Sequence, residues 1–80
     1  MNLVEFSEYL VSGLVDNADL VKVKDFSTDE EHTIEILVSE DDMGRVIGKG
    51  GKIAQSIKTL IQAKAYNEGI DNIKINIDSF

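Results

Sequence analysis

The sequence predicts an α+β domain in which three helices cover one face of a three-stranded sheet. Segments with apolar residues at helical spacing alternate with shorter segments in which apolar and polar residues alternate singly. Their order is helix, strand, strand, helix, helix, strand. One layer of helices packed on one sheet can bury all of their apolar stripes. Because 80 residues suffice for one domain, we expect residues 1–80 to form a single unit.

The first half of the chain predicts one helix and one β-hairpin. Residues 2–15 form the helix, and turn-forming side chains at residues 16–19 end it. Its apolar stripe contains Leu3, Phe6, Leu10 and Leu14. Residues 20–26 and 32–39 show the single alternation of strands, and the short acidic connection between them makes the pair an antiparallel hairpin.

The second half predicts two helices and a final strand. Residues 39–42 supply side-chain oxygens that cap a short helix reaching about Ile47. A longer helix runs from about residue 52 to residue 68, and Gly69 suits the position just past its end. Residues 71–78 alternate again and form the last strand. The expected buried stripe of the longer helix contains Ile53, Ile57, Leu60 and Ile61, with Ala54 and Ala65 at its margins.

A glycine-rich segment, Val46-Ile47-Gly48-Lys49-Gly50-Gly51-Lys52-Ile53, joins these two helices. Glycine permits positive φ and lacks the Cβ that would keep a ligand away from the main chain. The following helix directs free N–H groups and the positive end of its dipole at the segment. Lys49 and Lys52 add positive charge. We therefore expect a phosphate group to lie against the main chain here.

Two other glycine-rich phosphate motifs are absent. A P-loop needs Ser or Thr after its Gly-Lys pair, and a dinucleotide fingerprint needs a third glycine three residues after the second. Ile53 stands at both positions. What remains is G-x-x-G at residues 48–51, the loop with which KH domains clamp four nucleotides of RNA backbone.

The charge distribution favours the same segment. The chain is acidic as a whole, with 8 Lys and Arg against 15 Asp and Glu and a net charge of −7. Residues 43–67 nevertheless contain no acid. The basic residues in that window are Arg45, Lys49, Lys52, Lys58 and Lys64. Positive charge is thus concentrated around the loop, as an anion-binding surface requires, although a chance run of lysines on a solvated helix face is the alternative.

With these residues, the chain resembles a type II KH domain over nearly its whole length. Residues 46–48 and Gly51 match the I-G-x-x-G core of that fold, and a helix and a strand precede the shared unit. Its size and its segments 3–6 and 14–17 are similar to the small bacterial KH-domain protein A family. The resemblance implies a protein that binds single-stranded RNA and acts as an RNA chaperone in post-transcriptional regulation. It also implies a homodimer, or a heterodimer with a second KH-containing protein, and an effect on cell-envelope growth.

The candidate RNA-binding residues lie in the loop and at its two ends. They are Arg45, Ile47, Gly48, Lys49, Gly50, Gly51, Lys52 and Ala54. The loop glycines and lysines would hold phosphates. Arg45 either reaches the same RNA backbone or pairs with Asp41 or Asp42. Ile47 and Ala54, together with Ile53, either line an apolar groove for the bases or belong to the core.

Other chemistry is poorly supported by the composition. There is no cysteine, and His32 is the single histidine, so we expect no disulfide, metal or cofactor. No acid–base pair or nucleophile arrangement indicates an enzyme or a small-molecule substrate. Without a signal peptide or an apolar run of membrane-spanning length, we expect a cytoplasmic protein that does not enter a membrane. The alternative function is a protein-interaction module with a KH-like fold, which the acidic remainder of the surface favours.

Overall fold

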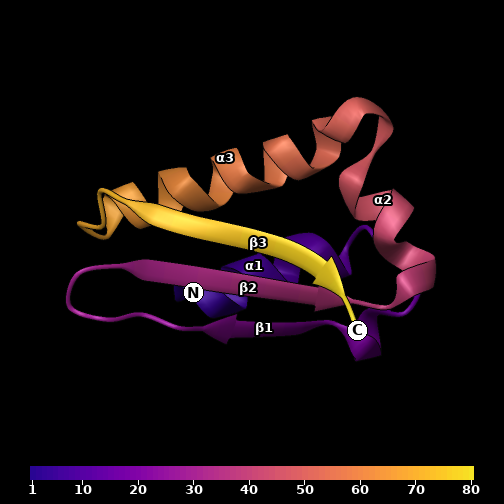
Figure 1. Ribbon diagram of the computed structural model, residues 1–80, viewed down its shortest axis with the longest axis horizontal. Helices are drawn as coiled ribbons and strands as arrows, with labels where there is room; N and C mark the ends of the chain where they lie inside the picture. The colour runs from indigo at the N-terminus through magenta and orange to yellow at the C-terminus, as the bar shows by residue number, and fades with distance from the viewer.

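The helices and strands follow the predicted order along the chain (Figure 1). The computed structural model covers residues 1–80. Its elements are α1 (Leu3–Ser12), β1 (Lys22–Asp25), β2 (His32–Val38), α2 (Met43–Ile47), α3 (Lys52–Asn67) and β3 (Ile73–Ser79). Single 3₁₀ turns, η1 (Ala18–Leu20), η2 (Glu40–Asp42) and η3 (Lys49–Gly51), lie in three of the connections. The α+β fold class is confirmed.

The sheet has the strand order β1-β2-β3, with β2 in the centre. β1 and β2 pair antiparallel, as predicted, with Lys22 opposite Leu37. β2 and β3 pair parallel, with His32 opposite Ile73. Because parallel neighbours need a crossover connection, α2, the glycine loop and α3 together form the link between β2 and β3 (Figure 1).

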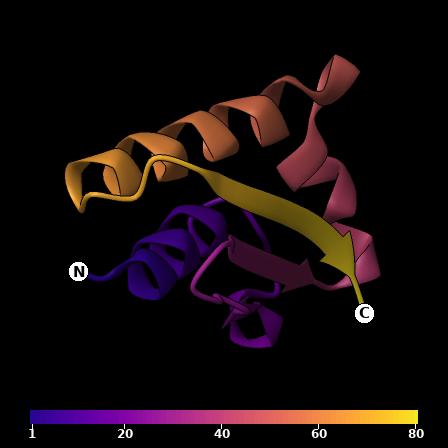
Figure 2. The same ribbon diagram turned by 60° about the vertical axis from the view of Figure 1, so that its left-hand side comes forward.

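The core lies between one face of the sheet and the three helices (Figure 2). Ile34, Ile36 and Val38 of β2 are fully buried on that face. The helices and β3 complete the core with Leu3, Val11, Val46, Ile57, Ile61, Ala65 and Ile75. Burying a large aliphatic side chain stabilises a fold by about 1.5–3 kcal/mol, so this cluster fixes the helices that flank the glycine loop.

α1 is shorter than predicted. Asn2 and Glu5 form a reciprocal capping box at its start, and the helix ends at Ser12 with Gly13 as C-cap. Residue 14 and residue 15 are therefore outside the helix, and Leu14 is 41% exposed. The buried face is centred on Leu3, Ser7 and Val11 instead. The Ser7 hydroxyl donates to the Leu3 carbonyl at 2.7 Å, which lets a polar side chain occupy the interior.

The strands also differ from prediction at their ends. The expected strand over 20–26 is reduced to β1, because the backbone turns through η1 just before it. The N–H of Leu20 donates to the Asn17 carbonyl at 2.9 Å, and that of Val21 donates to the Ala18 carbonyl at 3.2 Å. β3 begins and ends one or two residues later than the predicted range 71–78.

The predicted buried stripe of α3 was wrong in part. The buried residues are Ala54, Ile57, Ile61 and Ala65. Ile53 and Leu60, which were expected inside, are 37% and 49% exposed. The two alanines lie at the centre of the buried face rather than at its margins. The apolar stripe of this helix is thus wider than the surface that the rest of the domain covers.

Candidate nucleic-acid interface

Three glycines with positive φ shape the loop between α2 and α3. α2 ends at Ile47, and the N–H of Gly48 closes its last turn on the Gly44 carbonyl at 3.0 Å. The φ values of Gly48, Gly50 and Gly51 are +76°, +66° and +76°. Residues other than glycine rarely adopt a positive φ, so the reversal of the chain between the two helices depends on glycine.

The first glycine packs against a side chain, whereas the other two face open space. A Cβ at Gly48 would lie 2.6 Å from Cγ1 of Ile53, so the loop is closed tightly onto the start of α3. No heavy atom lies within 4 Å of a Cβ placed at Gly50 or at Gly51. A ligand can therefore approach the main chain in the second half of the loop.

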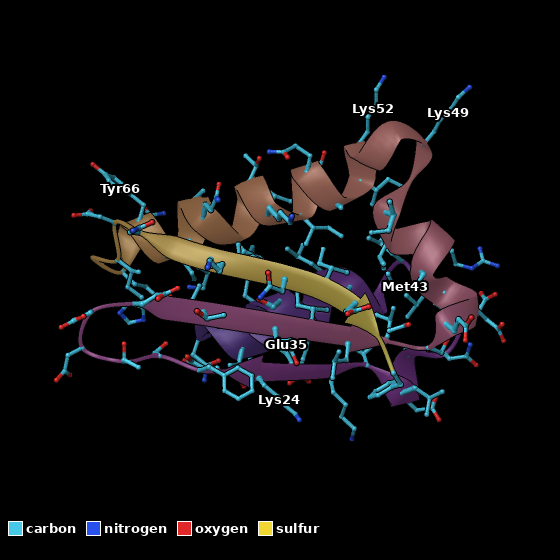
Figure 3. All side chains as sticks on the ribbon, viewed as in Figure 1. Lys24, Glu35, Met43, Lys49, Lys52 and Tyr66 are labelled. Atoms are coloured by element: carbon cyan, nitrogen blue, oxygen red, sulfur yellow. The ribbon has the colours of Figure 1, made fainter.

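The start of α3 and the two loop lysines face the same open region. No side chain caps the helix at Gly51, which leaves its first N–H groups without a side-chain acceptor. Lys49 and Lys52 are exposed and project away from the body of the domain (Figure 3). Neither lysine takes part in an ion pair. The positive charge at this end of the helix is therefore available to an anion.

Arg45 differs from the loop lysines. Its Nη2 lies 2.8 Å from Oδ2 of Asp16, and its Nε lies 3.5 Å from Oδ1 of Asp42. The structure thus pairs Arg45 with Asp42, as one of the two alternatives predicted from the sequence. It also pairs Arg45 with Asp16, which the sequence did not indicate. Asp41 is not a partner. A contact between Arg45 and RNA stays a prediction.

Asp42 is buried and ties α2 to the segment after α1. Its Oδ1 accepts the backbone N–H of Asp16 at 3.1 Å. Its Oδ2 accepts the backbone N–H and the side-chain amide of Asn17, each at 3.0 Å, and the Ser39 hydroxyl at 3.0 Å. The prediction that side-chain oxygens of residues 39–42 cap the following helix was therefore wrong, because neither Ser39 nor Asp42 makes a side-chain cap. The oxygens of Asp42 instead accept from Ser39 and from two residues far earlier in the chain.

The hydrogen bonds to Asp42 also fix its ionisation state. Burial by itself raises the pKa of this carboxyl. The two backbone N–H groups, the Asn17 amide and the Ser39 hydroxyl outweigh that effect and hold the pKa of Asp42 below its usual range. The group is therefore a carboxylate near neutral pH, and it holds the start of α2, and with it the loop, in a fixed position.

The three apolar candidates do not line one groove. Ala54 is buried in the core face of α3, and Ile47 is half-buried against the core. Ile53 instead lines an apolar groove of about 360 Å³ between α1 and α3. The other lining residues are Leu10, Leu14, Lys52, Ser56, Ile57 and Leu60. Sequence reasoning missed this groove, and the signal that could have found it is the wide apolar stripe of α3, in which Ile53 and Leu60 accompany Ile57 and Ile61.

Two further observations concern the surface at large. No group of three or more His, Cys, Asp and Glu side chains is arranged to hold a metal ion. None of the helices combines the length and the apolar content needed to cross a bilayer.

Comparison with known proteins identifies the family. A family model described as "KhpA/KhpB, KH domain" matches residues 4–77. RNA-binding protein KhpA of Caldanaerobacter subterraneus is 44% identical over 64 residues, which are 80% of this chain and 85% of that protein. RNA-binding protein KhpA of Mycobacterium tuberculosis is 42% identical over 59 residues, which are 74% of each chain.

Solved structures show the same fold at lower identity. Era of Aquifex aeolicus bound to GDP and aluminium fluoride superposes with a TM-score of 0.72 and 18% identity. The match covers 98% of this chain and 30% of Era, so the present fold corresponds to one part of that larger protein. Era in complex with a segment of 16S ribosomal RNA gives the same TM-score at 16% identity, over 96% of this chain and 29% of that one. Together with the G-x-x-G loop and the sequence matches, these findings show that the chain belongs to the KhpA/KhpB family of KH-domain proteins.

Proposed function

We propose that the chain binds single-stranded RNA, with backbone phosphates on the main chain of residues 48–51 and with Lys49 and Lys52 neutralising their charge. One observation carries this proposal. Open main chain at Gly50 and Gly51 lies beside an uncapped helix start and two lysines that are free of ion pairs. The names of the relatives, RNA-binding proteins, support the same function. A KH loop of this kind clamps about four nucleotides.

The salt dependence of RNA affinity tests this proposal. Each phosphate contact with single-stranded RNA contributes about −0.7 to the slope of log K against log salt. With Arg45 held by acids, two contacts are expected, so the slope should be about −1.4. Fluorescence anisotropy of a short unstructured RNA, titrated with the protein at several salt concentrations, measures it. A slope near zero would mean that phosphates are not held at the loop, and would favour a protein-interaction module instead.

We also propose that two KH domains associate through the apolar groove between α1 and α3, as a homodimer or with a second KH-containing protein. A single site for four nucleotides binds weakly and reads little sequence, because phosphate contacts position RNA without specifying bases. Two linked sites raise the apparent affinity for a longer RNA, by a factor on the order of 100 or more when the geometry fits. The observation in favour is that Leu14, Ile53 and Leu60 are exposed together around this groove.

Leu60→Glu is expected to abolish the homodimer, because it places a charge in the apolar groove. Sedimentation at micromolar concentration should show a dimer for the wild type and a monomer for the variant. Affinity for a short RNA should be unchanged, whereas affinity for an RNA long enough to reach two sites should fall.

Tyr66→Glu is the matched control for that experiment. Tyr66 is also exposed on α3, at 70%, but lies at the end of the helix away from the loop and outside the groove (Figure 3). The Tyr66→Glu substitution should leave the dimer intact. Equal effects of the two substitutions would exclude the groove as the contact surface. A monomeric wild type would exclude the homodimer, and co-purification with a second KH protein would then be the remaining test.

A further inference from the structure

Arg45 is the one cation close to the loop whose charge is already matched. It lies in α2, within the last turn before Gly48, and an arginine side chain is long enough to approach the same phosphates as the loop lysines. Its guanidinium instead contacts Asp16 at 2.8 Å and Asp42 at 3.5 Å. Lys49 and Lys52 have no such partner. The two carboxylates do not contribute equally to holding the Arg45 guanidinium.

Asp42 is a poor holder of this guanidinium. Both of its oxygens already accept hydrogen bonds from backbone and side-chain donors at 3.0–3.1 Å, and the distance of 3.5 Å to Arg45 is longer than those. The side chain of Asp16, in contrast, has Arg45 as its ion-pair partner at hydrogen-bonding distance. The charge-assisted contact to Asp16 is therefore the stronger of the two.

The position of Asp16 is set by the fold rather than by the ion pair itself. Its backbone N–H donates to buried Asp42, and so does that of the next residue, Asn17. The main chain is thus anchored on both sides of the Asp16 side chain, and its carboxylate is presented toward α2. The ion pair is also exposed, with 53% of the Arg45 side chain and 71% of the Asp16 side chain accessible. Water screens such a pair, so the ion pair restrains the Arg45 side chain but does not fix it in one position.

We propose that Asp16 withholds Arg45 from RNA, its carboxylate competing with backbone phosphate for the guanidinium. This inference rests on the proposed function and adds a positioning residue outside the loop. Asp16 touches no RNA in this scheme and acts through Arg45 alone. The wild-type site therefore holds phosphates with two lysines, and removal of the Asp16 charge makes a third cation available.

The test is the RNA affinity of Asp16→Asn, measured with the same short unstructured RNA as above. Release of Arg45 should raise the affinity about threefold to fivefold and should steepen the salt slope from about −1.4 to about −2.1, since one more phosphate contact is made. Arg45→Gln should lower the affinity much less in the wild-type background than in the Asp16→Asn background, where it should cancel the gain. Asp16→Ser repeats the test without a side-chain amide, and the melting temperature of each variant confirms that it folds.

Asp19→Asn is the control for net charge. Asp19 is exposed in η1, three residues away, and takes part in no ion pair. Equal gains for the two substitutions would overturn the proposal, because general repulsion would then explain both. Equal losses of affinity for Arg45→Gln in the two backgrounds would also overturn it, because Arg45 would then contact RNA whether or not residue 16 carries a charge. Failure of the proposed function itself would look different, as an affinity that does not depend on Lys49 and Lys52.

Discussion

Lys49→Glu combined with Lys52→Glu is expected to abolish RNA binding and leave the fold intact. Both side chains are exposed, lie in no ion pair and belong to no part of the core, so their replacement should leave the fold intact. Lys52 also lines the groove between α1 and α3, so the affinity is measured with a short RNA that occupies one site. A hydrogen bond to a charged group contributes about 1.5–3 kcal/mol, and two of them are replaced by repulsion. We expect a loss of affinity of about 100-fold or more, with an unchanged melting temperature.

Lys22→Glu combined with Lys24→Glu is the matched control. It makes the same change in net charge on exposed lysines of β1, far from the loop (Figure 3). This variant should bind RNA nearly as well as the wild type. If it loses as much affinity as the loop variant, the effect comes from the total charge of the protein. If the loop variant binds normally while folded, the loop is not the RNA site.

Gly48→Ala is expected to destabilise the domain more than any other single glycine-to-alanine exchange in the loop. Gly48 has φ +76° and ψ 174°, a backbone region that is essentially restricted to glycine and costs other residues about 1–3 kcal/mol. The added Cβ would also lie 2.6 Å from Cγ1 and 2.9 Å from Cβ of Ile53. Such overpacking typically costs a further 1–3 kcal/mol. The expected loss is about 3–5 kcal/mol in the free energy of unfolding, measured by chemical denaturation.

Gly51→Ala separates the two causes. Gly51 also has positive φ, at +76° with ψ 13°, but its Cβ position is open. Only the backbone cost remains there, about 1–2 kcal/mol. Ile53→Ala in the Gly48→Ala background should restore only part of this loss, because it removes the close contacts with Cγ1 and Cδ1 but keeps the Cβ at 2.9 Å. Equal losses at Gly48 and Gly51 would contradict the close packing of the loop onto α3.

The sequence predicts the order of the elements because that information is local. Alternation in residues 32–39 and helical spacing after residue 52 each report on a single segment, and the structure confirms both. The choice of which face of α3 is buried, in contrast, does not follow from a single segment. The sequence of α3 shows a wide apolar stripe, but which part is buried depends on the other elements that pack against it. Ala54 and Ala65 lie on the face that is buried, whereas Ile53 and Leu60 are exposed.

The sequence predicted the glycine motif of the candidate site but not the hydrogen bonds and ion pairs that surround it. The spacing of Gly48 and Gly51 with neighbouring lysines is readable in a single segment. The roles of Asp42 and Asp16 are not, because they depend on contacts between residues more than 20 positions apart. An acid at the start of a helix is ordinarily read as a cap, and only the tertiary structure shows that this one accepts hydrogen bonds from Asp16 and Asn17, in the segment after α1.

The placement of charge in this fold has a consequence for how the molecule meets its ligand. The acidic β1–β2 turn, with Asp29, Glu30 and Glu31, and the loop with its lysines lie toward opposite ends of the long axis, which spans 34 Å (Figure 1). The two loop lysines are therefore separated from this acidic cluster by much of the length of the domain. A polyanion that approaches from the side of the loop meets free lysines first, while salt screens the repulsion from the distant turn. We therefore expect RNA to approach from the loop side, although the protein as a whole is acidic.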